Sequence, residues 1–491
     1  MTADYPRWMR RIALVVLLVL MAGCSRRVSP DEALAKASPL IETGDFRKAT
    51  VILRNALYQP GVSEADAKKL SHQIDMLRRV HEDYSFTRAE LYDAISDAVS
   101  ELTPRQFNRW VNEGRFDGRR IDGKMYYVNT SVANLFFRYP DVVKRRVDGH
   151  YNVPEQKGRL AISRAIRKAA LEEKTPYVLP HHYLAAMTVQ AGTMAVRPKA
   201  LVRAWLPIPR LYPYQCDFKL VSNSSPVKLL APENSPIRSA YMEQNALRDG
   251  SAKFEITFSY TMDGVSFDLD PAKIQAPDMS DPVLKQYTSE SPHVVFTPEL
   301  KELSAKIAGT ETNPMLIAKA FYDWIGSNIK YSYAREYSTL TNIGDYCLSH
   351  HYGDCGQEAM LFITLCRSKG IPARWQTGWD IYPKYHDIHD WSEIYLAPYG
   401  WVPVDAWAGM FATRYCTSLT PVERAELHDF YFGGLDYYRM AANCDHSQQL
   451  DPPKQSARSD DVDFQRGELE SNGRDIYFDD YSYSIRIKEL K

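Results

Sequence analysis

The sequence predicts an α+β protein with several domains. At 491 residues the chain is too long for a single ordinary core. A helix-like period dominates residues 31–145, and a strand-like period of two replaces it between about 195 and 265. Over 296–410 the two patterns combine, because helices are followed there by a β-hairpin signal. These three observations indicate separate helical and β units ahead of a mixed core.

The first 30 residues have the features of an export signal. Three arginines precede the apolar run 12–21, and Ala22-Gly23-Cys24 follows it. The run is too short to span a bilayer, and small residues before a cut site are typical of a secretory signal. A Cys after Ala-Gly resembles a bacterial lipobox, so we expect a lipoprotein signal over 1–23, lipidation of Cys24 and a tether over 24–30. The alternative is a plain cleavable signal in which Cys24 is incidental.

This reading places the protein in the cell envelope, anchored by lipid to a membrane and facing the periplasm or the outer surface. The formal net charge of -1 favours no nucleic-acid partner. Export also permits disulfides, and six cysteines follow Cys24. Cys416 with Cys444 is one pair that the sequence allows.

Residues 31–145 are expected to form a helical module. The pattern from Asp31 to Pro60 resembles one tetratricopeptide-type helix hairpin, whereas a solenoid would need about three such units. Thr87 with Glu90 has the spacing of a capping box. We expect this module to offer a surface for a protein partner and a helical linker to follow it over 146–194.

Strand-like segments flank the mixed core on both sides. Residues 200–209 and 252–260 alternate and are bounded by Pro, Asn and Gly, which predicts a small β-sandwich over 195–265. The tail, 411–491, also contains short strand-like segments. We expect the tail to be an extension that packs on the core, with no catalytic role.

Cys355 is predicted at the first turn of a helix. Apolar residues recur at 359, 362, 363 and 366, Asp354 suits the N-cap, and Gly370 with Pro372 would end the helix. Unpaired N–H groups and the helix dipole stabilise a thiolate at such a position, which makes a cysteine there a candidate nucleophile. Cys366 lies deep in the same helix and is expected to be a core residue.

His389 and Asp405 are predicted on neighbouring strands of a hairpin. They can oppose each other only if the loop is odd and centred on Ala397, and the Pro-Tyr-Gly turn lies later, so we expect a β-bulge. A facing carboxylate would hold one imidazole nitrogen while the other addresses Cys355. Asp390 should point to the opposite face, and His386 is expected to be a solvated loop residue.

Together these motifs resemble the core of the transglutaminase-like superfamily. The resemblance rests on Gly353-Asp354-Cys355, on the run Leu-Cys-Arg-Ser-Lys-Gly-Ile-Pro-Ala-Arg at 365–374, on His-x-Trp-x-Glu-Ile-Tyr-Leu from His389, and on Gly-Trp-Val-Pro-Val-Asp ending at Asp405. It implies a papain-like core over 296–410 with Cys355 as nucleophile, His389 as base and Asp405 as orienting acid, and it implies no cofactor. The predicted β-sandwich is of the kind that often precedes such a core.

The resemblance also implies acyl transfer through a thioester on the amide bonds of a peptide or protein. Hydrolysis by a peptidase or amidase is the leading expectation. Transamidation of protein glutamines and a catalytically silent binding or scaffold protein are the alternatives. A zinc cluster of Cys347, His350, His351 and Cys355 is a further hypothesis, although its spacing lies outside the standard finger patterns.

Overall fold

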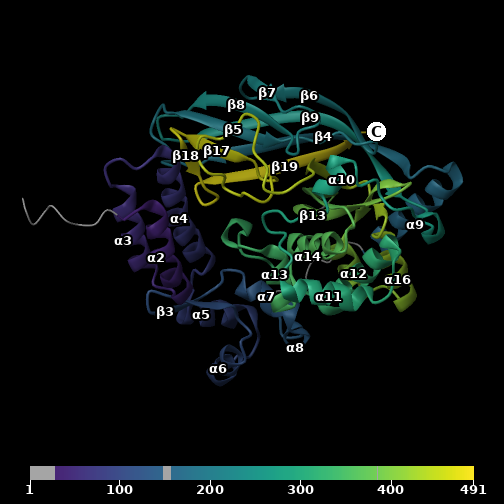
Figure 1. Cartoon of the computed structure of the whole chain (residues 1–491), viewed down its shortest axis with the longest axis horizontal. Helices are drawn as coiled ribbons and strands as arrows, with labels where there is room; N and C mark the ends of the chain where they lie inside the picture. The colour runs from purple at the N-terminus through teal and green to yellow at the C-terminus, as the bar shows by residue number, and fades with distance from the viewer. Residues whose placement is uncertain (1–27, 148–155, 384, 491) are drawn as a thin grey trace, which may run out of the picture. The chain divides into compact units, whose positions relative to one another are not determined.

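The computed structural model describes residues 28–147, 156–383 and 385–490, which form an α+β structure (Figure 1). The predicted signal and Cys24 lie outside the described residues. The chain divides into two compact units, one made of residues up to 85 with 118–126, and the other of 86–117 with the remainder from 127. The prediction of one module over 31–145 is therefore wrong, because residues 86–117 and those from 127 onward pack with the larger unit.

The described residues of the smaller unit form the helices α2 (Pro30–Thr43), α3 (Phe46–Leu57) and α4 (Glu64–Asp83), and the strand β2 (Gly118–Ile121). Gly44 joins α2 to α3 at a φ of 84°, and a Cβ there would clash with the carbonyl of Arg120. The carboxylate of Asp122 accepts from the Arg47 N–H at 2.9 Å. The predicted helix hairpin is present, with the β-turn at Asp122-Gly123 closing against it.

The larger unit begins with a small helical cluster. It comprises β1 (Phe86–Thr87), α5 (Arg88–Ala98), α6 (Pro104–Asn112), α7 (Ser131–Arg138) and α8 (Pro140–Val143), around a core that includes Leu91, Phe107 and Trp110. The capping box between Thr87 and Glu90 is confirmed, because the side chain of each bonds the backbone N–H of the other.

A β-sandwich follows, and it starts earlier than the sequence indicated. Helix α9 (Gln156–Glu173) ends before the long strand β4 (Tyr177–Ala191), so the predicted helical linker over 146–194 is wrong in its second half. One sheet has the order β15-β9-β4-β19 with β6 beside β9, and the other has the order β18-β17-β5-β8-β7. The bounds are β5 (Leu201–Pro207), β6 (Gln215–Asn223), β7 (Val227–Leu230), β8 (Ser239–Asn245), β9 (Ala252–Ser266), β15 (Gly434–Leu435), β17 (Glu468–Ser471), β18 (Arg474–Ile476) and β19 (Tyr481–Leu490).

The tail is part of both sheets instead of a separate extension. Figure 1 shows the yellow strands β17, β18 and β19 beside the teal strands of the sandwich. Strand β19 pairs with β4 over ten residue pairs, from Tyr481 with Ala191 to Leu490 with His182. Leu469 and Ile485 therefore lie in the same buried core as the residues of β4, β5 and β9.

The mixed core has a four-stranded sheet in the order β14-β13-β12-β16, made of β12 (Ala373–Tyr382), β13 (Tyr385–Leu396), β14 (Gly400–Val404) and β16 (Arg439–Asn443). Its helices are α10 (Pro282–Gln286), α11 (Pro298–Ala308), α12 (Pro314–Asn328), α13 (Ile343–His350), α14 (Cys355–Ser368), α15 (Ala406–Tyr415) and α16 (Pro421–Phe430). Short elements complete it, η1 (Pro271–Lys273), η2 (Tyr337–Thr339) and the parallel pair β10 (Lys330–Tyr331) and β11 (Tyr352–Gly353).

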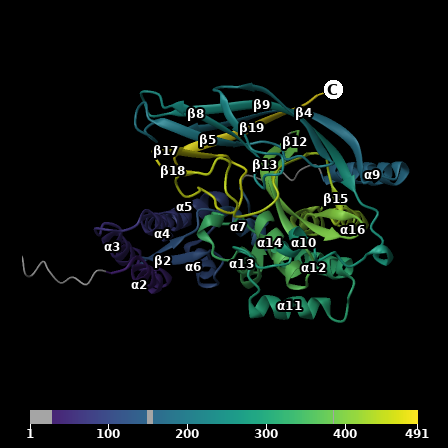
Figure 2. The ribbon, with the colours of Figure 1, turned by 45° about the horizontal axis from the view of Figure 1, so that its top comes forward.

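Helix α14 lies at the centre of this core, between α12, α13 and strand β13 (Figure 2). All of its residues from Gly356 to Arg367 are buried. Its buried surface extends around the whole helix and includes the polar side chains of Gln357, Glu358 and Arg367 as well as apolar ones. Among the described residues, no helix combines the length and the apolar character needed to cross a bilayer.

Candidate active site at the start of helix α14

Cys355 is the first residue of α14, as the sequence predicts. Asp354 is the N-cap, and its side chain accepts from the Gln357 N–H at 3.0 Å, while Gln357 Oε1 accepts from the Asp354 N–H at 3.4 Å. This reciprocal capping box fixes the first turn of the helix. The thiol therefore projects from a helix start whose backbone conformation is held by its own side chains.

His389 and Asp405 are in direct contact. His389 Nε2 lies 2.8 Å from Asp405 Oδ2. The pairing of β13 with β14 runs without interruption from Leu396 with Gly400 to Ser392 with Val404. The predicted bulge is wrong, because the connection between the strands already has an odd number of residues and keeps the two side chains on one face. Asp405 follows the last residue of β14 and reaches His389 diagonally.

Asp405 also begins the next helix, because its Oδ1 accepts from the Ala408 N–H at 2.9 Å. The guanidinium of Arg439 lies 2.9 Å from Asp405 Oδ2 and 3.0 Å from Asp380 Oδ1. Burial alone would raise the pKa of Asp405, but the charges of His389 and Arg439 hold it well below its usual range. Asp405 thus stays ionised and can orient the imidazole through Nε2, which leaves Nδ1 for a second partner.

The sulfur of Cys355 bonds a different residue. Its S–H donates to Asp390 Oδ2 at 3.7 Å, and within the described part of the chain it has no hydrogen bond to His389. Burial, and then the carboxylates of Asp390 and Asp354, raise the pKa of the Cys355 thiol well above its ordinary value. The helix start favours a thiolate in principle, but burial and the two carboxylates oppose it.

Asp390 has the orientation that the sequence predicts, away from Asp405, yet it contacts the sulfur of Cys355. Its Oδ1 accepts from Gln465 Nε2 at 2.7 Å, and its Oδ2 accepts from the Tyr337 hydroxyl at 3.3 Å. Burial raises the pKa of Asp390 to about 7. Gln465 also donates to the His389 carbonyl at 3.0 Å, so the tail contacts both neighbouring residues of β13.

Cys366 is fully buried in the core around α14, as expected. His386 was expected in a solvated loop, but it is a half-buried residue of β13 paired with Ile381. In the described ranges, no group of His, Cys, Asp or Glu side chains is arranged to hold a metal ion, so the four residues of the zinc hypothesis do not form a ligand set.

The described cysteines are all free thiols. Cys416 and Cys444, a pair that the sequence allowed, are therefore not bonded to each other. Cys416 is the C-cap of α15 and packs with residues of α9 and α16. Cys444 follows β16. Burial raises the pKa of its thiol, and the charges of Arg210 and Arg374 partly offset that rise.

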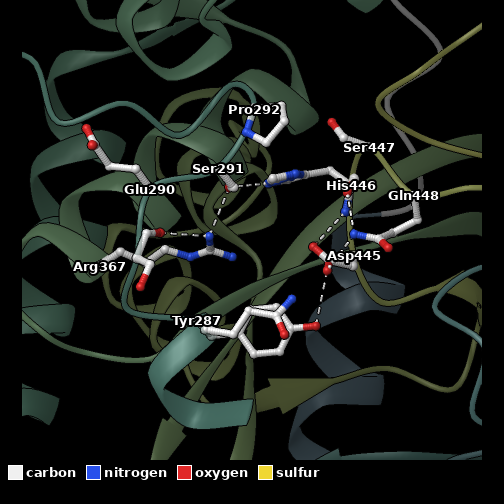
Figure 3. Close-up of a pocket in the computed structure, with 11 residues that line it drawn as sticks. Tyr287, Glu290, Ser291, Pro292, Arg367, Asp445, His446, Ser447 and Gln448 are labelled. Carbon is white, nitrogen blue, oxygen red and sulfur yellow. Dashed lines mark hydrogen bonds between the residues drawn. The ribbon is translucent and has the colours of Figure 1, made fainter. Parts of the chain in front are cut away.

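A second polar site lies at the other end of α14 (Figure 3). Its cavity has a volume of about 430 Å³. Arg367 donates to Ser291 Oγ at 3.1 Å, and the same oxygen lies 3.2 Å from His446 Nε2. Because Arg367 is in the last turn and Cys355 is the first residue, the helix rise separates them by about 18 Å. This cavity is therefore distinct from the site around Cys355.

Comparison with known proteins identifies the core. Residues 301–406 match the family model of the transglutaminase-like superfamily, so the chain contains a transglutaminase-like core with all three predicted site residues inside the match. An uncharacterized protein of Haemophilus influenzae is 29% identical over 151 residues, which cover 25% of this chain and 40% of that protein. The chain thus spans less than half the length of this curated relative.

Two solved structures are also similar. A candidate cysteine protease from Cytophaga hutchinsonii is 17% identical with a TM-score of 0.41, and the match covers 64% of this chain and 92% of that chain. The periplasmic domain of TgpA from Pseudomonas aeruginosa is 12% identical with a TM-score of 0.25, over 55% of this chain and 96% of that chain.

Proposed function

We propose that this protein is a cysteine-dependent enzyme that hydrolyses amide bonds of peptides or proteins through a thioester. The observation that supports this most is the buried His389–Asp405 pair, held by Arg439, together with a cysteine at a helix start whose S–H bonds Asp390, the residue next to His389 on β13. A buried imidazole with an ionised partner is what a thiol needs as its base.

The steps follow from these groups. The thiol proton passes to His389 Nδ1 and the sulfur attacks the amide carbonyl carbon, while the Cys355 N–H at the open first turn can bond the developing oxyanion. The C–N bond breaks as the imidazolium returns its proton to the leaving amine. Water then attacks the thioester, gives its proton to His389, and the acid leaves as the thiol is restored.

The test is a peptide library incubated with and without an added primary amine, with product masses read by mass spectrometry. Hydrolysis is expected, with products that gain one water at the amide and do not change when the amine is present. Cys355→Ala should abolish the products, and the control Cys216→Ala should retain them, since Cys216 lies on the edge of the sandwich. Amine-containing products would assign transamidation, and full turnover by Cys355→Ala would reject the proposal.

We propose further that the protein acts at the cell envelope, attached by lipid at Cys24. The support is the sequence of the first 24 residues, with a short apolar run before Ala22-Gly23-Cys24. Cys24→Ser is expected to move the protein from the membrane fraction to the soluble fraction, and unchanged membrane association in that variant would reject lipidation. The helices of the smaller unit are proposed as the surface for a protein partner.

A further inference from the structure

Asp390 acts on the sulfur of Cys355 through two groups of opposite effect. Its carboxylate accepts the S–H at 3.7 Å and raises the pKa of the thiol, whereas its backbone N–H favours the thiolate. Asp390 directly follows His389 on β13, so the two side chains leave opposite faces of the strand. The base and the carboxylate that opposes ionisation are therefore neighbours in the chain.

The carboxylate of Asp390 is held in place. Gln465 donates to Oδ1 at 2.7 Å, and the single proton of the Tyr337 hydroxyl is shared between Asp354 Oδ1, at 2.7 Å, and Asp390 Oδ2, at 3.3 Å. Gly356 leaves the space for this network, because a Cβ there would lie 2.6 Å from Asp390 Oδ2. The contact with Cys355 is therefore built by three segments of the fold and does not depend on a mobile surface side chain.

The groups around Asp390 give its charge little compensation. The polar and titratable ones are Cys355 on α14 and its N-cap Asp354, Tyr337 on η2, Thr377 on β12, His389 on β13, and Asp463 and Gln465 in the tail. Of these, His389 is the one that can be positively charged. An acid in such surroundings takes up a proton more readily than an exposed one.

We propose that Asp390 is a positioning residue that controls when Cys355 becomes a nucleophile, because its carboxylate holds the sulfur as a thiol and its protonation releases the thiol proton to His389. The inference rests on the proposed function, since it takes His389 as the acceptor. Oδ2 gains one proton from solvent, the thiol proton moves to His389 Nδ1, and the Nε2 proton stays on the bond to Asp405. The result is a thiolate and an imidazolium beside a neutral Asp390.

The direction of the pH dependence follows. In acid solution Asp390 is protonated and does not oppose the thiolate. As the pH rises through neutrality Asp390 ionises, and the added negative charge works against ionisation of Cys355. The thiolate fraction should therefore rise less steeply between pH 6 and 8 than the tenfold per pH unit of an isolated thiol below its pKa.

The experiment is the rate of alkylation of Cys355 by iodoacetamide, followed by peptide mass mapping from pH 5 to 9 in the full chain. Asp390→Asn is expected to match the wild type at pH 5 and to react about tenfold faster at pH 8, because losing the charge of Asp390 lowers the pKa of the Cys355 thiol. Asp387→Asn, the same change on the same strand, should follow the wild-type profile.

A ratio of the two rates that is the same at pH 5 and pH 8, or a slower Asp390→Asn variant, would overturn the inference. If circular dichroism shows that Asp390→Asn is unfolded, the wild-type profile decides, and a full tenfold rise per unit from pH 6 to 8 would overturn it. Failure here leaves the proposed hydrolysis intact, because that proposal depends on the loss of products in Cys355→Ala.

Discussion

Asp405 occupies the position where a strand ends and a helix begins, and it serves both elements. One oxygen caps α15 and the other meets His389 and Arg439. The alternation of side chains along two strands was enough to predict the contact with His389. Arg439 could not be predicted, because it belongs to a tail strand whose place beside β12 depends on long-range pairing. Gln465 could not be predicted either, because it lies far along the chain from His389 and Asp390, which it contacts only in the folded protein.

Arg439 is expected to be essential for stability as well as for the orientation of Asp405. Arg439→Met removes the buried guanidinium that lies against the carboxylates of Asp405 and Asp380, so the free energy of unfolding should fall by about 3–5 kcal/mol. Urea denaturation measures this change. The matched variant is Arg164→Met, which breaks an exposed pair with Glu426 and should cost about 1 kcal/mol or less. Equal losses in the two variants would contradict the assigned role of Arg439.

At the scale of elements, helix α14 shows what local patterns can and cannot predict. Its start at Cys355, its N-cap and its end before Pro372 follow from capping and helix-stop residues. Its burial on all sides was not apparent, because small and polar residues such as Gly356 and Thr364 interrupt the apolar pattern. Gly356 leaves room for side chains that pack closely against the helix, and the Thr364 hydroxyl bonds the Met360 carbonyl. Such neighbours are known only from the folded structure.

Glycines within two of the helices should respond to alanine in opposite ways. Gly356→Ala places a Cβ against the Tyr337 hydroxyl and Asp390, so we expect it to lower stability and to change the alkylation rate of Cys355. Gly326→Ala in α12 meets its nearest atom, His428 Nε2, at 3.5 Å, and should stabilise by roughly 0.5–1 kcal/mol through helix propensity. Thermal unfolding measures both. A stabilised Gly356→Ala would show that the site is looser than described.

At the scale of the larger unit, the sheets are assembled from segments far apart in the chain. The sequence indicated strands in 200–209 and 252–260, which are present as β5 and β9, and a strand-like segment near the end of the tail, which is present as β19, whereas β17 was not indicated. Alternation reveals that a segment is a strand, but it does not reveal its partner. The pairing of β19 with β4, and the long strand β4 itself, were therefore missed.

The tail is expected to contribute directly to stability through its buried side chains. Leu469→Ala shortens a fully buried side chain in the core between the two sheets. The free energy of unfolding should fall by about 2–5 kcal/mol. Leu490→Ala, at the end of β19, changes a side chain that is 38% exposed and should have a much smaller effect. Denaturant midpoints compare the two. Similar small losses would show that the tail is only loosely attached to the sandwich.

The claim that joins these scales is that one cysteine, activated by His389, is the nucleophile. Its most direct test is iodoacetamide labelling of the native protein, with the rate at each cysteine read by peptide mass mapping. We predict that Cys355 is labelled fastest, well ahead of the buried Cys366, and that His389→Ala slows Cys355 alone. Equal labelling of Cys355 and Cys366, or an unchanged Cys355 rate in His389→Ala, would contradict the account.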